Sequence, residues 1–228
     1  LVRPSAVHLR LAQMSFLCAG RPLIECGLYV AHDGAYRARV EVDGTTEISG
    51  QVDLELPGVT YKCTVKRGGA TGSRVLAVLS PGMGTLTTPI GGQSFYEASP
   101  RTILQQTIGL EALNAELPAI LDEPIARWVR AAGPTDEAVS ILAKYLGLAW
   151  WFEPDGTIKL GELMYPPSSV TIDVLPNDNP EWGRLSFASE DGTVLPRTTV
   201  TTDYGSYAVT EVLYSLRNGI WRGFLYYA

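Results

Sequence analysis

The stretch that decides the fold is Tyr36-Arg-Ala-Arg-Val-Glu-Val-Asp43. Its residues alternate between two faces, with Tyr36, Ala38, Val40 and Val42 on one side and charged residues on the other. Successive side chains of a β-strand point to opposite faces, so strict alternation is the pattern of a half-buried strand. We therefore predict a strand at 36–43 with one face on a core and the other in solvent.

Residues 51–56 and 61–66 repeat this alternation, and their expected inward side chains are Val52, Leu54, Leu56, Tyr61, Cys63 and Val65. Asp43-Gly44, Pro57-Gly58 and Gly68-Gly69 separate the runs, and all three pairs are typical of turns. We interpret Gly68–Gly72 as a hairpin tip. Several short half-polar strands at this spacing predict an antiparallel sandwich or barrel over residues 1–98.

The hydrophobic period changes at Ser99-Pro100, where a helix-capping residue precedes a proline at the first helical position. The apolar side chains that follow share one helical face and are Ile103, Leu104, Thr107 and Ile108. Gly109 is suited to end the helix, since glycine readily adopts the left-handed conformation found there. A first helix is therefore expected directly after the β region.

A second helix is expected after Gly133-Pro134, because Asp136 and Glu137 suit the positive end of a helix dipole. Its expected buried stripe is Ala138, Ile141, Leu142, Tyr145 and Leu146, with Lys144 outside it and Gly147 as the stop. The next segments, 148–152 and 157–160, flank Glu153-Pro-Asp-Gly156 and predict a β-hairpin with a type I turn. Residues 125–130 are interpreted as a short strand.

From Tyr165 onward the pattern is β again, with Pro166-Pro167 at the boundary and an exposed loop at 175–181. Asp191-Gly192 and Asn218-Gly219 predict hairpin turns. The last run, Ile220–Ala228, is apolar on both faces, as expected of a strand that is buried or joins another chain. We predict a mainly β (α+β) chain of three parts: a β-barrel domain at 1–98, a small α/β insertion at 99–164 and a second β domain at 165–228.

The composition limits the kinds of function that the chain can have. The chain has 228 residues, 46% hydrophobic and 18% charged, with a net charge of −6. It lacks a Lys/Arg run, which gives sequence-specific nucleic-acid binding little electrostatic support. Three cysteines without a Cys-x-x-Cys pair indicate buried free thiols. The apolar stretches are too short for a membrane helix, and Leu1–Pro4 does not resemble the start of an export signal.

Candidate catalytic, cofactor and metal sites receive little support, and we expect none. His8 and His32 are the only histidines and lie 24 positions apart without neighbouring metal ligands. Gly82-Met-Gly84 is followed by Thr87 where a dinucleotide fingerprint needs glycine or alanine. The sequence has no Gly-x-Ser-x-Gly elbow of an α/β-hydrolase, and Gly68–Gly72 lacks the Lys-Ser/Thr of a phosphate loop.

Two kinds of side-chain pair leave alternatives open. Asp53 with Glu55, or Asp122 with Glu123, supplies the paired carboxylates of a glycosidase, although solvated surface is the simpler interpretation. Trp150 and Trp151 suggest a platform for a sugar or a base. Adjacent strand residues face opposite ways, so at most one of them can serve as a platform while the other is core.

A family resemblance is carried by the segments SPRTILQQTIGLEAL (99–113) and RWVRAAGPTDEAVSILAKYLGLAWWFEPDGTIKLGE (127–162). In order, these show a short helix, a small-residue turn, a helix ending in Leu-Gly-Leu, a tryptophan strand and a Pro-Asp-Gly turn. The chain thereby resembles phage tail baseplate hub proteins, a family that includes late-control tail proteins and the hub part of type VI secretion spikes. Residues 56–84 also resemble the last strands of the hub's first barrel. The resemblance extends over about residues 30–165.

The resemblance implies a non-catalytic homotrimeric ring with two tube-like barrels per subunit, which adapts a threefold spike to a sixfold tail tube. The implied partners are the tail tube or its initiator, the central spike, the tape-measure protein and other baseplate proteins. DNA would be passing cargo through an acidic lumen, and the location would be the virion's tail baseplate, assembled in the host cytoplasm. The early end of the chain implies no fused lytic domain. Two alternatives remain: a β-rich carbohydrate-binding or hydrolytic tail component, and a tube or sheath initiator.

Overall fold

A computed structural model of the chain describes residues 16–82, 86, 88–109, 119–175, 178, 181, 183–188 and 194–228. The first structural unit is a closed antiparallel barrel of six strands in the order β1-β4-β5-β6-β3-β2, with β2 pairing back onto β1. The strands are β1 (Leu17–Cys18), β2 (Arg21–Ala31), β3 (Arg37–Asp43), β4 (Gln51–Leu56), β5 (Val59–Thr71) and β6 (Arg74–Pro81). The fold class predicted from the alternating runs, mainly β with a barrel and two helices, is confirmed.

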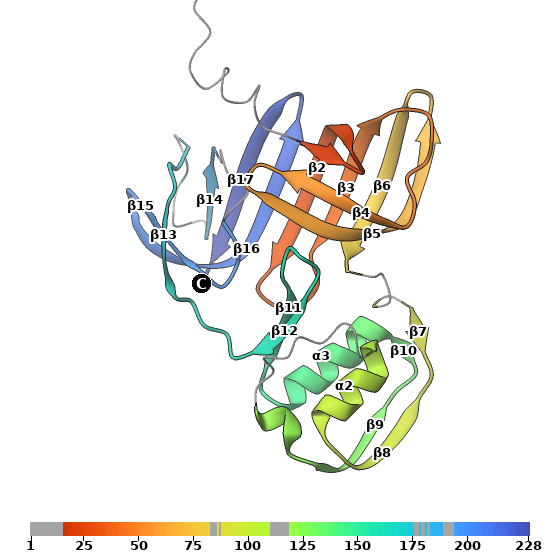
Figure 1. Cartoon of the computed structure of the whole chain (residues 1–228). Coiled ribbons are helices and arrows are strands. Elements are labelled where there is room, and N and C mark those ends of the chain that lie inside the picture. Colours follow the sequence, from red (N-terminus) through yellow and green to blue (C-terminus); the bar gives the residue numbers. More distant parts are fainter. Residues whose placement is uncertain are drawn as a thin grey trace, which may run out of the picture.

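A second group of strands continues the same sheet. These strands are β13 (Pro167–Thr171), β14 (Arg184–Phe187), β15 (Thr199–Thr202), β16 (Gly205–Arg217) and β17 (Ile220–Tyr227). Strand β16 pairs with β2 over Glu211–Leu216, so β17, β16, β2, β3 and β6 lie side by side across the molecule (Figure 1). An isolated bridge between Val174, which follows β13, and Phe187 of β14 links the two ends of the second group of strands.

The two groups repeat the same four-strand arrangement. In the first, β3 pairs with β6, β6 with β5, and β5 with β4; in the second, β14 pairs with β17, β17 with β16, and β16 with β15. The long hairpins match in length as well, since β5 and β16 have 13 residues each and β6 and β17 have 8 each. The chain therefore contains two versions of one β-unit joined through the β2–β16 pair.

The insertion lies below the sheet and consists of two helices, a β-ribbon and a hairpin (Figure 1). Its elements are β7 (Pro89–Ile90), β8 (Gln93–Ala98), α2 (Pro100–Ile108), the 3-10 helix η3 (Ala119–Asp122), β9 (Ile125–Arg130), β10 (Gly133–Pro134), α3 (Thr135–Tyr145), β11 (Ala149–Phe152) and β12 (Ile158–Gly161). Arg130 is buried there and donates to the Thr107 hydroxyl at 2.9 Å and to the backbone oxygen of Gly91 at 3.2 Å. This arginine ties the β8–β9 ribbon to α2.

Most of the predicted local structure is confirmed. The inward faces of β3 and β4 are buried as expected, and the strand at 125–130 is present as β9. The Ser99 hydroxyl accepts from the Thr102 N–H at 3.2 Å, and α2 buries the four side chains that its sequence pattern predicts. The predicted turn after β11 is closed by the Gly156 N–H, which donates to the Glu153 carbonyl at 2.9 Å.

The predicted hairpin tip at Gly68–Gly72 is wrong for Gly68 and Gly69, which lie inside β5. The turn is formed by Gly72-Ser73, between the paired residues Thr71 and Arg74. A Cβ at position 68 would lie 3.0 Å from the Leu76 carbonyl oxygen, so the glycine serves close strand packing. A bulge between Val65 and Arg67 also interrupts the predicted alternation, and Val65 is only half-buried.

The predicted buried stripe of the second helix is confirmed for Leu142 and wrong for Ile141 and Tyr145, while Ala138 and Leu146 are half-buried. Helix α3 buries Thr135, Val139, Leu142 and Ala143, whereas Ile141 and Tyr145 are 50% and 61% exposed. The helix presents a narrow face to α2 and β11, and Ile141 and Tyr145 lie beside that face. Tyr145 instead packs on Trp128, with ring centroids 5.1 Å apart.

Some predictions fall on residues outside the described ranges. These are the start at Leu1–Pro4, His8, the Gly82-Met-Gly84 fingerprint with Thr87, most of the 175–181 loop and the Asp191-Gly192 turn. The Asn218-Gly219 turn is described and confirmed, since both residues have positive φ, of 51° and 71° respectively, between β16 and β17.

Candidate functional site

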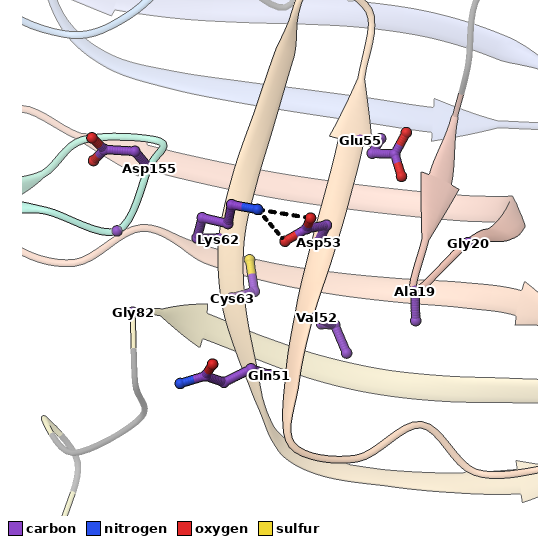
Figure 2. A pocket seen from close by; sticks show the side chains of 11 residues that line it. Ala19, Gly20, Gln51, Val52, Asp53, Glu55, Lys62, Cys63, Gly82 and Asp155 are labelled. Atoms are coloured by element: carbon purple, nitrogen blue, oxygen red, sulfur yellow. Dashed lines mark hydrogen bonds and ion pairs between the residues drawn. The ribbon is translucent and has the colours of Figure 1, made fainter.

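A groove of about 680 Å³ lies on the outside of the first barrel, between β4, β5 and the tip of the β11–β12 hairpin (Figure 2). Its charged residues are acidic apart from one lysine. Lys62 Nζ contacts both carboxylate oxygens of Asp53, at 2.8 and 2.9 Å, while Glu55 and Asp155 lie on either side. Because both partners of the ion pair are about half exposed, it contributes at most about 1 kcal/mol.

The groove offers a poor setting for catalysis. The Cys63 thiol is the candidate nucleophile in the lining of the groove. Burial raises the pKa of this thiol well above the usual range, so it stays protonated at neutral pH. Asp53, the candidate acid of the predicted carboxylate pair, is engaged by Lys62. The lining of the groove contains no histidine to serve as a general base. Its chemistry is that of an exposed polar surface.

The groove marks the place where the hairpin docks on the barrel. The backbone N–H of Lys62 donates to the Pro154 carbonyl at 2.7 Å, and this hydrogen bond joins β5 to the hairpin turn. Gly82 and Gly156 are in contact here, since a Cβ on Gly156 would lie 3.4 Å from the Gly82 Cα, and both have positive φ, of 60° and 85°, which a side chain would strain. This joint requires two glycines, and it fixes the insertion relative to the first barrel.

A second joint connects the hairpin to the junction of the two β-units. The Trp150 N–H donates to the Asp33 carboxylate at 3.0 Å, and the Gly34 N–H donates to the Trp150 carbonyl. From the second unit, Arg197 places its guanidinium over the Trp151 ring, 4.4 Å from the centroid. The same guanidinium donates to the Ala31 and His32 carbonyls at 3.3 Å each. Burial lowers the pKa of Arg197 to about 10.

The two tryptophans of the hairpin are both engaged within the chain. Trp150 is buried, and its indole N–H donates to the Ser140 hydroxyl of α3 at 2.9 Å. The Trp151 face is covered by Arg197, and its indole N–H donates to Glu153 at 2.7 Å. The one tryptophan that the strand geometry left as a possible platform is therefore occupied by an arginine.

The remaining candidate residues have structural partners. His32 forms a 3.1 Å hydrogen bond between Nδ1 and the Thr210 carbonyl oxygen, across the junction of the units. Asp122 accepts from Arg101 at 2.6 Å, and this hydrogen bond lowers the pKa of its carboxyl. Cys18, Cys26 and Cys63 are free and buried, as predicted. Over the described ranges, no group of three or more His, Cys, Asp or Glu side chains is placed to hold a metal ion.

The sequence patterns miss two features. One is Arg197, which lies 46 positions from Trp151 and has no motif around it. The other is the outward face of the continuous sheet, where the strand register brings together arginines scattered from Arg37 to Arg222. A count of arginine on the polar sides of alternating strands is the one signal that points to this face. In the part of the chain that is described, no helix is long and apolar enough to cross a membrane.

Comparison with known proteins finds similarity in structure only. No family model and no curated protein sequence matches the chain. Among solved structures, it is similar to the 43 kDa tail protein of prophage MuSo2 from Shewanella oneidensis, with a TM-score of 0.66 and 11% identity over 94% of this chain and 97% of that one. The tail protein from Neisseria meningitidis MC58 gives 0.66 and 11% over 93% and 95%.

A third similar structure is the E. coli c3393 protein, a component of the type VI secretion system whose description notes similarity to the T4 tail proteins gp27 and gp5. It gives a TM-score of 0.65 at 8% identity and covers 95% of this chain and 75% of that one. At these identities the match defines a fold, which the chain shares with phage tail proteins and a type VI component.

Proposed function

We propose that the chain is a non-catalytic structural component of a phage-type tail, and that it forms a trimeric hub ring between the tail tube and the central spike. The similar structures support a tail role, because two of them are tail proteins, one from a prophage, that are matched over nearly their whole length. The proposed location is the tail baseplate of the virion. The proposed neighbours are the tube or its initiator, the spike, the tape-measure protein and other baseplate proteins, with DNA as passing cargo.

The observation that carries the ring is the repeated β-unit. Two similar units in one chain allow three copies to present six similar units around an axis, which suits a junction between threefold and sixfold parts. We retain the three-part division at 1–98, 99–164 and 165–228, except that β7 and β8 belong with the insertion because they pair with β10 and β9. In this division the insertion holds the two units at a set angle. The hairpin contacts to Lys62, Asp33 and Arg197 support that role.

The repeat also supplies the contact that would close the ring. In the second unit, Leu213–Leu216 pairs with β2 along one edge of β16. The β5–β6 and β16–β17 hairpins can be aligned at their turns, where Thr71 and Arg217 are the last residues before the turn. In this alignment Arg67–Ala70 of β5 corresponds to Leu213–Leu216 of β16. Within the described part of the chain, β4 pairs with this edge of β5 at Val59–Thr64, and no strand pairs with it at Arg67–Ala70. An edge strand with unpaired backbone groups is a template for pairing with another copy.

Mass photometry of the purified chain tests the proposal. A trimer of 24.7 kDa subunits gives a species of about 74 kDa. Thr71 and Arg74 flank a two-residue turn and are hydrogen-bonded to each other, so the Thr71 N–H points toward β6. Because backbone N–H groups alternate in direction along a strand, the Ala70 N–H points toward the opposite, open edge of β5. Ala70→Pro removes that donor and should shift the population to monomer, whereas Ala70→Ser keeps the donor and the trimer. A wild-type monomer at micromolar concentration contradicts the ring.

The two alternative functions receive less support. A carbohydrate-binding role needs an accessible aromatic platform. Trp150 is buried, Trp151 is covered by Arg197 and Trp221 stacks on Tyr214, which leaves the partly exposed Trp128–Tyr145 pair for that role. Screening the protein against host glycans and peptidoglycan addresses this role, and specific binding or cleavage would favour it over the hub. A tube or sheath initiator of the same particle remains the second alternative, and six copies per ring would favour that role.

A further inference from the structure

The outward face of the continuous sheet has a charge opposite to that of the chain. We define this arginine face by the solvent-side residues of β6, β3, β2, β16, β17 and β14 and of the Arg67–Thr71 part of β5. Its arginines are Arg37, Arg39, Arg67, Arg74, Arg184, Arg217 and Arg222, and its acids are Glu25, Glu41, Asp43 and Glu211. The balance is +3, which leaves 11 basic and 20 acidic residues, or −9, for the rest of the chain.

The basic residues of this face are of one type. Half of the chain's 14 arginines lie here, and all four lysines lie elsewhere. Arginine presents a planar fork of donors that matches a phosphate group in two-point contact, whereas lysine acts as a point charge. Six of the seven are exposed, Arg184 being the half-buried one over the Phe224 ring. The face therefore carries the chemistry of phosphate recognition.

The arginines are arranged in rows by the strand register. One row runs across six strands as Arg67, Val78, Arg39, Gly27, Ser215 and Arg222. Strands are about 4.8 Å apart, which places Arg67 about 10 Å from Arg39 and Arg39 about 14 Å from Arg222 at the backbone. These spacings bracket the width of about 12 Å of the major groove of B-DNA, so the row can contact the phosphates on both sides of a groove.

Two hollows lie between the arginines, and each has a glycine in its lining. One, of about 250 Å³, is lined by Gly27, Arg39 and Arg217 together with the carboxylates Glu25 and Glu41; the other, of about 410 Å³, has Gly69, Arg39 and Arg67 in its lining and no acidic residue. A Cβ on Gly27 or Gly69 would meet nothing within 4 Å, so neither glycine is required by packing. Glycine in a strand also marks places where a ligand approaches the backbone closely.

We propose that the arginine face binds the phosphate backbone of nucleic acid without reading its sequence. The proposal deepens the proposed function, since in a ring this face would border the path of the DNA. It differs from the acidic lumen implied by net charge, because the charge of the whole chain does not describe this face. Between the arginines of the row, Val78 and Gly27 offer no side-chain hydrogen bond to bases and Ser215 offers one hydroxyl, so contacts to phosphate dominate.

Fluorescence anisotropy with a labelled 30-base-pair duplex tests the proposal on the full chain. We expect binding at low salt that is equal within about twofold for two unrelated sequences and falls steeply as salt rises. The variant Arg39→Gln/Arg67→Gln/Arg222→Gln should lose at least about tenfold in affinity and reduce the slope of log K against log salt by about 2 to 3. The control Arg127→Gln/Lys144→Gln/Lys159→Gln removes the same charge elsewhere and should stay within about twofold.

Several outcomes overturn the proposal. They are no binding by the wild type at low salt, an equal loss in the control variant, and binding of polyglutamate in preference to DNA. If the triple variant fails to fold, Glu25→Gln provides the opposite change, and it should strengthen binding about two- to fivefold. Mass photometry of the same samples keeps the two claims separate. An intact trimer without DNA binding overturns this inference alone, and DNA binding by a monomer overturns the ring alone.

Discussion

The guanidinium of Arg197 lies 4.4 Å from the centre of the Trp151 ring and joins three parts of the chain. Arg197 belongs to the second β-unit, Trp151 to the hairpin, and the Ala31 and His32 carbonyls that it also reaches belong to the end of β2. Its side chain is 11% exposed, so the contacts form away from bulk water. Together with the Trp150–Asp33 and Gly34–Trp150 hydrogen bonds, Arg197 holds the insertion against the junction of the units.

Replacing Arg197 by alanine is expected to lower the free energy of unfolding by about 2–4 kcal/mol, since it removes a cation–π contact and leaves two carbonyls without a donor. Urea denaturation measures the loss. In a double-mutant cycle with Trp151→Leu, the coupling between the two side chains should be about 1–2 kcal/mol. A coupling near zero would show that Arg197 acts through its carbonyl contacts alone.

Substituting Gly223 of β17 is expected to be severely destabilising. A Cβ there would lie 2.2 Å from Phe187 of the paired strand β14, whose ring covers the glycine. We expect Gly223→Ala to cost about 3 kcal/mol, because overpacking forces the ring or the strand to move. Gly27→Ala is the matched control, since a Cβ there meets nothing within 4 Å.

Thermal or urea unfolding of both variants checks this expectation, and Phe187→Leu should relieve part of the cost of Gly223→Ala by shortening the obstructing side chain. If Gly27→Ala and Gly223→Ala are equally harmful, the close contact is not the cause.

The stability of the first barrel should fall at alkaline pH. Burial raises the pKa of Cys18 to about 11 and that of Cys26 to about 12. Above the ordinary thiol pKa, the unfolded chain loses protons that the folded barrel keeps, so unfolding becomes easier as pH rises from about 9 to 11. Each buried thiol contributes at most about 1.4 kcal/mol per pH unit in that window.

Urea titrations at pH 8, 9.5 and 10.5 measure this slope. The Cys26→Ala variant should show a smaller slope than the wild type, because it removes one of the protons retained by the fold. An identical slope in both proteins would rule out the Cys26 thiol as a contributor.

The cap of α2 has a local effect that can be measured separately. Ser99→Ala removes the hydroxyl that accepts from the Thr102 N–H, and it should cost about 1 kcal/mol in the free energy of unfolding. Ser73→Ala, at an exposed turn of the barrel, should change stability by less than about 0.5 kcal/mol. Equal effects from the two variants would argue against the cap.

The accuracy of the sequence-based predictions follows the range of the interactions involved. The β3 and β4 faces and the Ser99 cap depend on residues a few positions apart, and these predictions are confirmed. The α3 stripe is wrong for Ile141 and Tyr145 because two overlapping apolar stripes run along that helix, and only contact with α2 and β11 selects the one through Val139.

Features that depend on pairing between distant strands were outside the reach of local patterns. The β2–β16 pair joins residues about 185 positions apart, and it alone makes the two units one sheet. The arginine face exists only because that register aligns Arg39, Gly27, Ser215 and Arg222. For the same reason the net charge of −6 misrepresents this surface.

Electron microscopy of the purified chain tests the central claim most directly, because threefold symmetry around a pore is the property that the repeated β-unit is proposed to serve. Class averages viewed along the axis should show a ring of three copies with six similar lobes around an open centre. Monomers without rings, or a ring built from six copies, would contradict the trimeric hub.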